Sequence, residues 1–79
     1  MKMFEKVCEV FAEELCIDRE KITPESALKE DLGLDSLDLI SLIDELEDTY
    51  DIRFPDEEMN VRTVGEVVEV LERLVAQKG

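Results

Sequence analysis

The sequence has no histidine and no tryptophan, and its only aromatic residues are three phenylalanines and one tyrosine. Without histidine, the chain cannot build a Ser-His-Asp triad or a histidine-ligated zinc site, so we expect a protein that is not an enzyme. Basic residues are also scarce. The sequence has nine lysines and arginines against 22 aspartates and glutamates, which gives a formal net charge of −13. Binding to nucleic-acid phosphates usually requires a basic surface. This composition therefore excludes nucleic acid as the expected partner.

Long apolar runs and a cysteine framework are missing as well. The first five residues show neither the apolar core nor the cleavage site of a signal peptide, so we expect a cytoplasmic protein without membrane insertion. The two cysteines, Cys8 and Cys16, are eight residues apart in a segment with a helical pattern. At about 1.5 Å per residue their Cα atoms would be about 12 Å apart, too far for a disulfide. We predict two free thiols, with Cys8 buried.

Seventy-nine residues provide one small domain, residues 1–79, and no second core. Apolar residues recur with the helical period in three segments, which predicts helices at about 2–16, 36–50 and 64–76. A short acidic turn at 56–59 predicts a marginal further helix, and no segment has the pattern of a strand. We therefore expect an all-α fold, a small antiparallel four-helix bundle of three longer helices and one short helix.

A connection of 19 residues, 17–35, separates the first two predicted helices. Loops of this length in small domains are usually functional or disordered. Here apolar residues are spaced along the loop and could attach it to the core, so we expect an ordered loop. These residues are Ile22, Leu28, Leu32 and Leu34.

Two stretches have the spacing of a capping box at a helix start, Asp35 with Asp38 and Thr63 with Glu66. The first of them places Ser36 at the junction between the long loop and the second helix. In an ordinary capped helix start, either Asp35 or Ser36 would accept a backbone N–H, and the serine would have no further role. Alternatively, its exposed hydroxyl could carry an esterified phosphate near the free N–H groups of the helix start, although both aspartates would repel that anion.

The acidic residues are concentrated in the middle of the chain. Residues 30–58 contain 12 acids and one base, whereas the segments on either side are nearly balanced. On the second predicted helix, acids including Asp38, Asp44 and Asp48 surround Leu37 and Ile40, which lie away from the apolar stripe. Such a face predicts docking to a basic patch with a shallow apolar pocket. Alternatively, Leu37 packs back under the preceding loop and the acids only form a solvated surface.

The segment Asp31-Leu-Gly-Leu-Asp-Ser-Leu-Asp38 resembles the phosphopantetheine attachment motif of acyl carrier proteins. The resemblance covers essentially the whole chain, and Thr63-Val64-Gly65 matches the start of that family's last helix. It implies that Ser36 receives 4′-phosphopantetheine from coenzyme A. It also implies two kinds of partner, a separate Mg²⁺-dependent phosphopantetheinyl transferase (holo-acyl carrier protein synthase) and acyl-chain-processing enzymes that bind through basic patches.

The resemblance and the charge pattern together predict a docking surface on the second helix. Its predicted members are Asp35, Leu37, Asp38, Ile40, Asp44, Glu47 and Asp48. Ser41 stands where many members of the family have an acidic residue, and Asp44 stands where many have an apolar one. The docking surface is therefore rearranged relative to the common pattern of the family.

The implied function is to carry growing acyl chains as thioesters on the arm at Ser36. The length and the strong acidity of the chain favour fatty acid biosynthesis, and we expect a monomer by default. The acids near the motif do not form a calcium loop, because Ser36 occupies the position that needs glycine and Leu42 the one that needs glutamate. We therefore expect no metal site. Two alternatives remain open, a carrier of polyketide or aminoacyl and peptidyl units, and an acidic helical protein-binding module without a prosthetic group.

Overall fold

The structure is a computed structural model, and it describes residues 2–78. The elements follow in the order α1 (Lys2–Leu15), η1 (Arg19–Lys21), α2 (Ser36–Tyr50), η2 (Asp56–Glu58) and α3 (Val64–Lys78), where η denotes a 3-10 helix. The all-α bundle expected from the sequence is confirmed. Its short helix is a single 3-10 turn, η2, and the sequence did not indicate η1. None of the helices in the described part of the chain is long and apolar enough to span a membrane.

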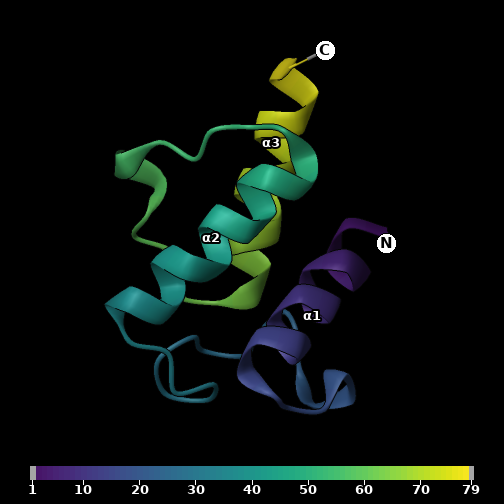
Figure 1. The fold of residues 1–79 in the computed structure, drawn as a ribbon, viewed down its shortest axis with the longest axis vertical. Helices are drawn as coiled ribbons and strands as arrows, with labels where there is room; N and C mark the ends of the chain where they lie inside the picture. Colours follow the sequence, from purple (N-terminus) through teal and green to yellow (C-terminus); the bar gives the residue numbers. More distant parts are fainter. Residues whose placement is uncertain (1, 79) are drawn as a thin grey trace.

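The three long helices pack around one core, and α1 contacts both α2 and α3. Figure 1 shows that α1 runs in the opposite direction to α2, whereas α3 runs in the same general direction as α2. Two helices that follow one another in the chain can be parallel only if the connection between them runs back along the whole length of the first helix. A helix of 15 residues is about 22 Å long, and the residues between α2 and α3 are numerous enough to cover that distance.

The core takes one face from each long helix, as the helical periods predicted. Phe11 of α1, Leu46 of α2 and Leu71 of α3 are completely buried. Val10 and Val70 are also buried, although they lie at the edges of the predicted apolar faces. The helices α1 and α3 are thus in contact with the core over more than the predicted apolar stripe, whereas the buried residues of α2 all lie within it.

The first loop is anchored to this core, as the spacing of its apolar residues predicted. Ile22, Leu28 and Leu34 are buried, and Leu32 is half-buried. The loop also touches the start of α3, where Ala27 and Thr63 form an isolated antiparallel bridge. The long loop is therefore a packed part of the fold that leads directly into α2.

The connection between α2 and α3 is held by a buried side chain and by charged groups. Asp51 ends α2 in the left-handed conformation, with φ 53°, and its N–H donates to the Glu47 carbonyl. The Glu47 carboxylate then accepts the backbone N–H of Phe54 at 2.6 Å, and the Phe54 side chain is buried. Farther along, Glu58 of η2 forms an ion pair with Arg73 of α3 at 2.6 Å. These contacts fix η2 against the bundle.

Candidate functional site

The predicted capping box at the start of α2 is present. Asp35 is the N-cap residue, and its Oδ1 accepts the backbone N–H of Asp38 at 2.8 Å. In return, Asp38 Oδ2 accepts the backbone N–H of Asp35 at 3.5 Å. Ser36 is the first helical residue, and its side chain is exposed. The two aspartates supply an ordinary cap for α2, and this cap does not use the Ser36 side chain.

Ser36 reaches the surface directly after a buried anchor. Leu34 is buried, and its N–H donates to the Leu28 carbonyl at 2.9 Å. Gly33, just before it, has φ 70°, a conformation that glycine adopts without steric cost. Ser36, two residues after Leu34, is already in α2, and its side chain is exposed. The hydroxyl of Ser36 is therefore accessible while its backbone is fixed from both sides.

The electrostatic field at Ser36 is mixed. The first N–H groups of a helix have no partner inside the helix, and together with the helix dipole they favour an anion. In α2 the Asp35 carboxylate already takes one of these groups, the N–H of Asp38. An esterified phosphate on Ser36 fits this exposed position, with the free N–H groups in its favour and the two carboxylates against it.

Leu37 and Ile40 are exposed over 74% and 46% of their surface, more than any other large hydrophobic residue among positions 2–78. The alternative in which Leu37 packs back under the first loop is wrong. Leu34 enters the core without it. Exposed carboxylates are close in sequence on the same helix: Asp35, Asp38, Asp44 and Asp48. An apolar pair beside carboxylates is thus present on α2, with Leu37 directly after Ser36 and Ile40 one turn beyond Ser36.

Glu47 lies beside Asp44 and Asp48, but it differs from them in its contacts. Its side chain is half-buried, and its carboxylate holds the backbone N–H of Phe54 in the next connection. A shallow depression of about 480 Å³ lies here, lined by residues from the end of α2 and the segment after it. No sequence pattern indicated this contact, because it joins residues seven positions apart across a helix end.

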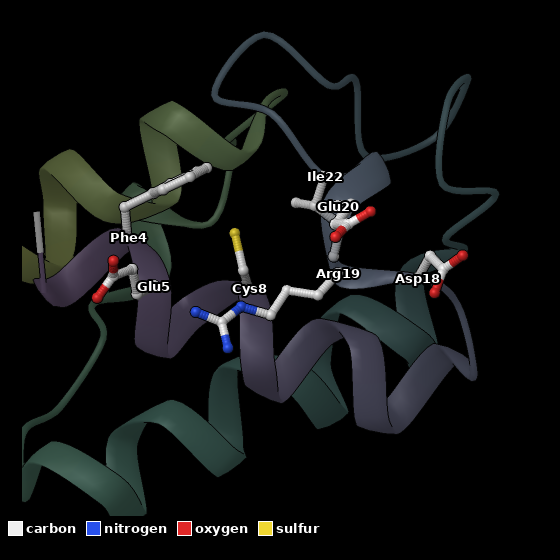
Figure 2. Close-up of a pocket in the computed structure, with 7 residues that line it drawn as sticks. All are labelled: Phe4, Glu5, Cys8, Asp18, Arg19, Glu20 and Ile22. Atoms are coloured by element: carbon white, nitrogen blue, oxygen red, sulfur yellow. The ribbon is translucent and has the colours of Figure 1, made fainter.

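A second depression, of about 590 Å³, lies between α1 and η1, and Figure 2 shows the residues that line it. Cys8 is on its floor, with the Arg19 side chain extending past it. Burial raises the pKa of the Cys8 thiol, and Glu5 raises it further, while the positive charge of Arg19 works in the opposite direction. The lining residues are Phe4, Glu5, Cys8, Asp18, Arg19, Glu20 and Ile22, none of them in the attachment motif.

We expect the two cysteines to react with iodoacetamide at very different rates. Both are free, but Cys8 is buried and Cys16 is exposed. Because the thiolate is the reactive form, the raised pKa of Cys8 lowers its reactivity further. At neutral pH, mass spectrometry of the apo protein should show rapid addition of one label at Cys16. A second label should appear only on addition of denaturant, and two labels at similar rates in buffer would contradict the packing of Cys8.

The carboxylates and thiols of the described residues do not form a cluster suited to a metal ion. Within residues 2–78, no group of three or more histidine, cysteine, aspartate or glutamate side chains could hold a metal ion. The carboxylates nearest to Ser36 are instead used in the capping box and in the turn before it, where Asp31 Oδ2 accepts the Ala27 N–H at 2.7 Å. This contact of Asp31 was not indicated by the sequence, in which Asp31 only marked the beginning of the motif.

Comparison with known families matches residues 5–71 to the family described as "Phosphopantetheine attachment site". Solved structures agree with this match. An acyl carrier protein from Thermotoga maritima is 30% identical, with a TM-score of 0.87, over 99% of this chain and 92% of its own. A candidate acyl carrier protein from Mycobacterium tuberculosis is 39% identical, with a TM-score of 0.85, over 90% of this chain and 96% of its own.

The fold and the matched attachment domain define the class as carrier proteins with covalently bound 4′-phosphopantetheine. Within this class, the chain belongs to the acyl carrier proteins. Members of this family are carriers rather than enzymes. Their partners are the transferase that attaches the arm and the enzymes that process the acyl group.

Proposed function

We propose that this protein carries acyl chains as thioesters on a 4′-phosphopantetheine arm attached to Ser36, in fatty acid biosynthesis. The observation that carries the proposal is the state of Ser36 itself. Its side chain is exposed at the first position of α2, and Asp35 and Asp38 supply the helix cap in its place. The match to the attachment family, residues 5–71, includes this position.

Attachment requires one new bond at Ser36. Its Oγ forms a bond to the phosphorus that bears pantetheine, a P–O bond within the diphosphate of coenzyme A breaks, and the adenosine-containing half leaves. The hydroxyl proton passes to a base of the transferase. Once attached, the arm supplies a thiol that holds the acyl group as a thioester. The capping box fixes the backbone of Ser36, and the folded carrier brings the thioester to each enzyme at high local concentration.

Partner enzymes dock on the exposed face of α2 in this proposal. Leu37 and Ile40 enter a shallow apolar pocket, and Asp35, Asp38, Asp44 and Asp48 face basic patches around it. Glu47 contributes less than the sequence suggested, because its carboxylate is bonded to Phe54. The monomeric state and the cytoplasmic location stay predictions from the sequence.

Mass spectrometry of the intact protein tests the attachment site. The purified apo protein is incubated with a broad-specificity phosphopantetheinyl transferase, Mg²⁺ and coenzyme A. We expect the mass of one phosphopantetheine to be gained by the native chain and by Ser41→Ala, and no gain by Ser36→Ala. Ser41 is a matched control, since it is another exposed serine of α2. A gain in Ser36→Ala, or no gain in the native chain, would overturn the assignment.

The cargo is tested separately with the loaded carrier. Fatty acid synthesis enzymes should elongate an acetyl or malonyl group on it, and adenylating enzymes that load amino acids should not use it. Loading with an aminoacyl unit instead of fatty acid elongation would favour the alternative carrier function. Either result leaves the attachment at Ser36 intact.

A further inference from the structure

The start of α3 is joined to the first loop by a small backbone junction. The first N–H groups of a helix have no partner within the helix, so they need acceptors from elsewhere. At α3 the N–H of Glu66 donates to the Thr63 hydroxyl at 3.2 Å. The N–H groups of Val64 and Gly65 donate to carbonyls of the first loop, and one loop N–H donates in the opposite direction. The three bonds are Val64 N–H to Ser26 O (3.1 Å), Gly65 N–H to Pro24 O (2.9 Å) and Leu28 N–H to Arg62 O (2.8 Å).

Gly65 allows this approach for a steric reason. A Cβ atom built on Gly65 would lie 2.9 Å from the Pro24 carbonyl oxygen and 3.4 Å from Pro24 Cβ. The nearer atom belongs to the backbone and accepts the N–H of Gly65, so it cannot rotate away while that bond is kept. Gly33 differs, because it has φ 70° and open space around its Cα. Any side chain at Gly65 must therefore push the loop away from α3.

Hydrogen bonds within the first loop connect this junction with Ser36, the attachment serine. Asp31 Oδ2 accepts the Ala27 N–H at 2.7 Å, which closes the turn between these two residues. The Ala27 carbonyl accepts the N–H of Asp31 at 2.9 Å, so the turn is bonded in both directions. The carbonyl of the next residue, Leu28, accepts the N–H of Leu34 at 2.9 Å. Leu34 lies two residues before Ser36, so a continuous set of short contacts connects the start of α3 with Ser36.

We propose that Gly65 and Asp31 are positioning residues for the attachment reaction. Gly65 lets the first loop lie directly on α3, Asp31 closes the turn that follows, and the two together fix where Ser36 stands relative to the bundle. This inference rests on the proposed attachment at Ser36. It assigns to the start of α3, which is remote from Ser36 in the sequence, a role in presenting that serine to the transferase.

The first test compares Gly65→Ala with Leu74→Ala in the transferase assay. Leu74 is a half-buried residue of α3 that packs against the core, so its truncation should lower stability without touching the junction. At a temperature where both variants are fully folded, Gly65→Ala should lower kcat/KM for the carrier at least about threefold, with the KM for coenzyme A unchanged. A larger loss would support the same role, because a 1 Å misplacement costs up to about a hundredfold in rate. Leu74→Ala should react like the native chain.

The second test uses Asp31, which is exposed, so its variants should fold even if Gly65→Ala does not. Asp31→Ala removes the acceptor of the Ala27 N–H and should lower kcat/KM for the carrier. Asp31→Asn loses the same charge but keeps an acceptor oxygen, and it should restore most of the rate. In amide NMR spectra, Asp31→Ala should shift the signals of Leu34 and Ser36 and leave the last turns of α3 unchanged.

The outcomes separate this inference from the proposed function. Native rates for Gly65→Ala and Asp31→Ala, or equal losses for Asp31→Ala and Asp31→Asn, would overturn the positioning role while Ser36 remained the attachment site. A loss in Leu74→Ala as large as that in Gly65→Ala would also overturn it, because it would indicate a general effect of stability. If the native chain gained no phosphopantetheine at all, the attachment proposal itself would fail.

Discussion

Replacing both Leu37 and Ile40 by alanine should weaken binding to the transferase by about a hundredfold and leave the thermal stability almost unchanged. Burying a leucine or isoleucine in an interface is worth about 1.5–3 kcal/mol, so each truncation should cost about tenfold in affinity. In the isolated protein Leu37 is 74% and Ile40 46% exposed, so their loss removes much less packing than the loss of a core residue. Titration calorimetry or biosensor measurements on the single and double variants would measure the effect.

A charge reversal at Asp44 provides a companion measurement. Asp44 is an exposed residue of α2 and a member of the predicted docking surface. Asp44→Lys should slow association with the partner and reduce its dependence on salt, because rim charges mainly affect the association rate. The control is Glu69→Lys, which makes the same charge change at an exposed position of α3. Equal effects of the two reversals would contradict a docking surface on α2.

Replacing Leu46 by alanine should lower the stability of the fold, whereas the change at Leu37 should lower partner binding and leave stability almost unchanged. Leu46 is 0% exposed in the centre of the bundle. Truncation of a buried leucine costs about 2–5 kcal/mol, and a small domain has only about 5–15 kcal/mol of total stability. We therefore expect a large fall in the urea midpoint for Leu46→Ala, or a largely unfolded protein.

The matched control for Leu46→Ala is Leu37→Ala, because it makes the same chemical change in the same helix. The two leucines are nine residues apart, which at about 100° per residue places them on opposite sides of α2. Circular dichroism during urea titration would give both unfolding curves. Similar losses of stability for the two variants would contradict the placement of α2 on the core.

The helical period predicted the burial of Leu46 but not the exposure of Leu37. The apolar stripe that includes Leu46 follows the helical period and predicted a buried face, which the structure confirms. Leu37 lies outside the stripe, and the sequence left two readings of it. The choice depended on whether the first loop covers the start of α2, which local sequence does not encode. Leu28 and Leu34 are buried and attach the first loop to the core, so the loop does not cover Leu37, which stays exposed.

Glu47 shows the limit of reading charge along a helix. By its position on α2 it was grouped with the docking acids, but its carboxylate binds the N–H of Phe54. That bond exists because Asp51 takes a left-handed conformation and turns the chain back over the end of the helix. The same turn begins the connection that makes α3 run parallel to α2. Neither consequence follows from the composition of the segment.

The sequence by itself determined the parts of this protein that depend on local chemistry. The helical period fixed the long helices, the capping box of Asp35 and Asp38 fixed where α2 begins, and the motif around Ser36 indicated the carrier family. These features involve residues within a turn or two of one another, so their spacing is visible in the chain.

Only the tertiary structure decided which surfaces are free and which distant segments meet. It left Leu37 exposed, used Glu47 to hold a connection, and brought Gly65 against Pro24. Such contacts join segments whose separation is set by packing of the whole bundle. They arise because buried backbone groups must find partners wherever the core brings them, and this requirement leaves no periodic trace in the sequence.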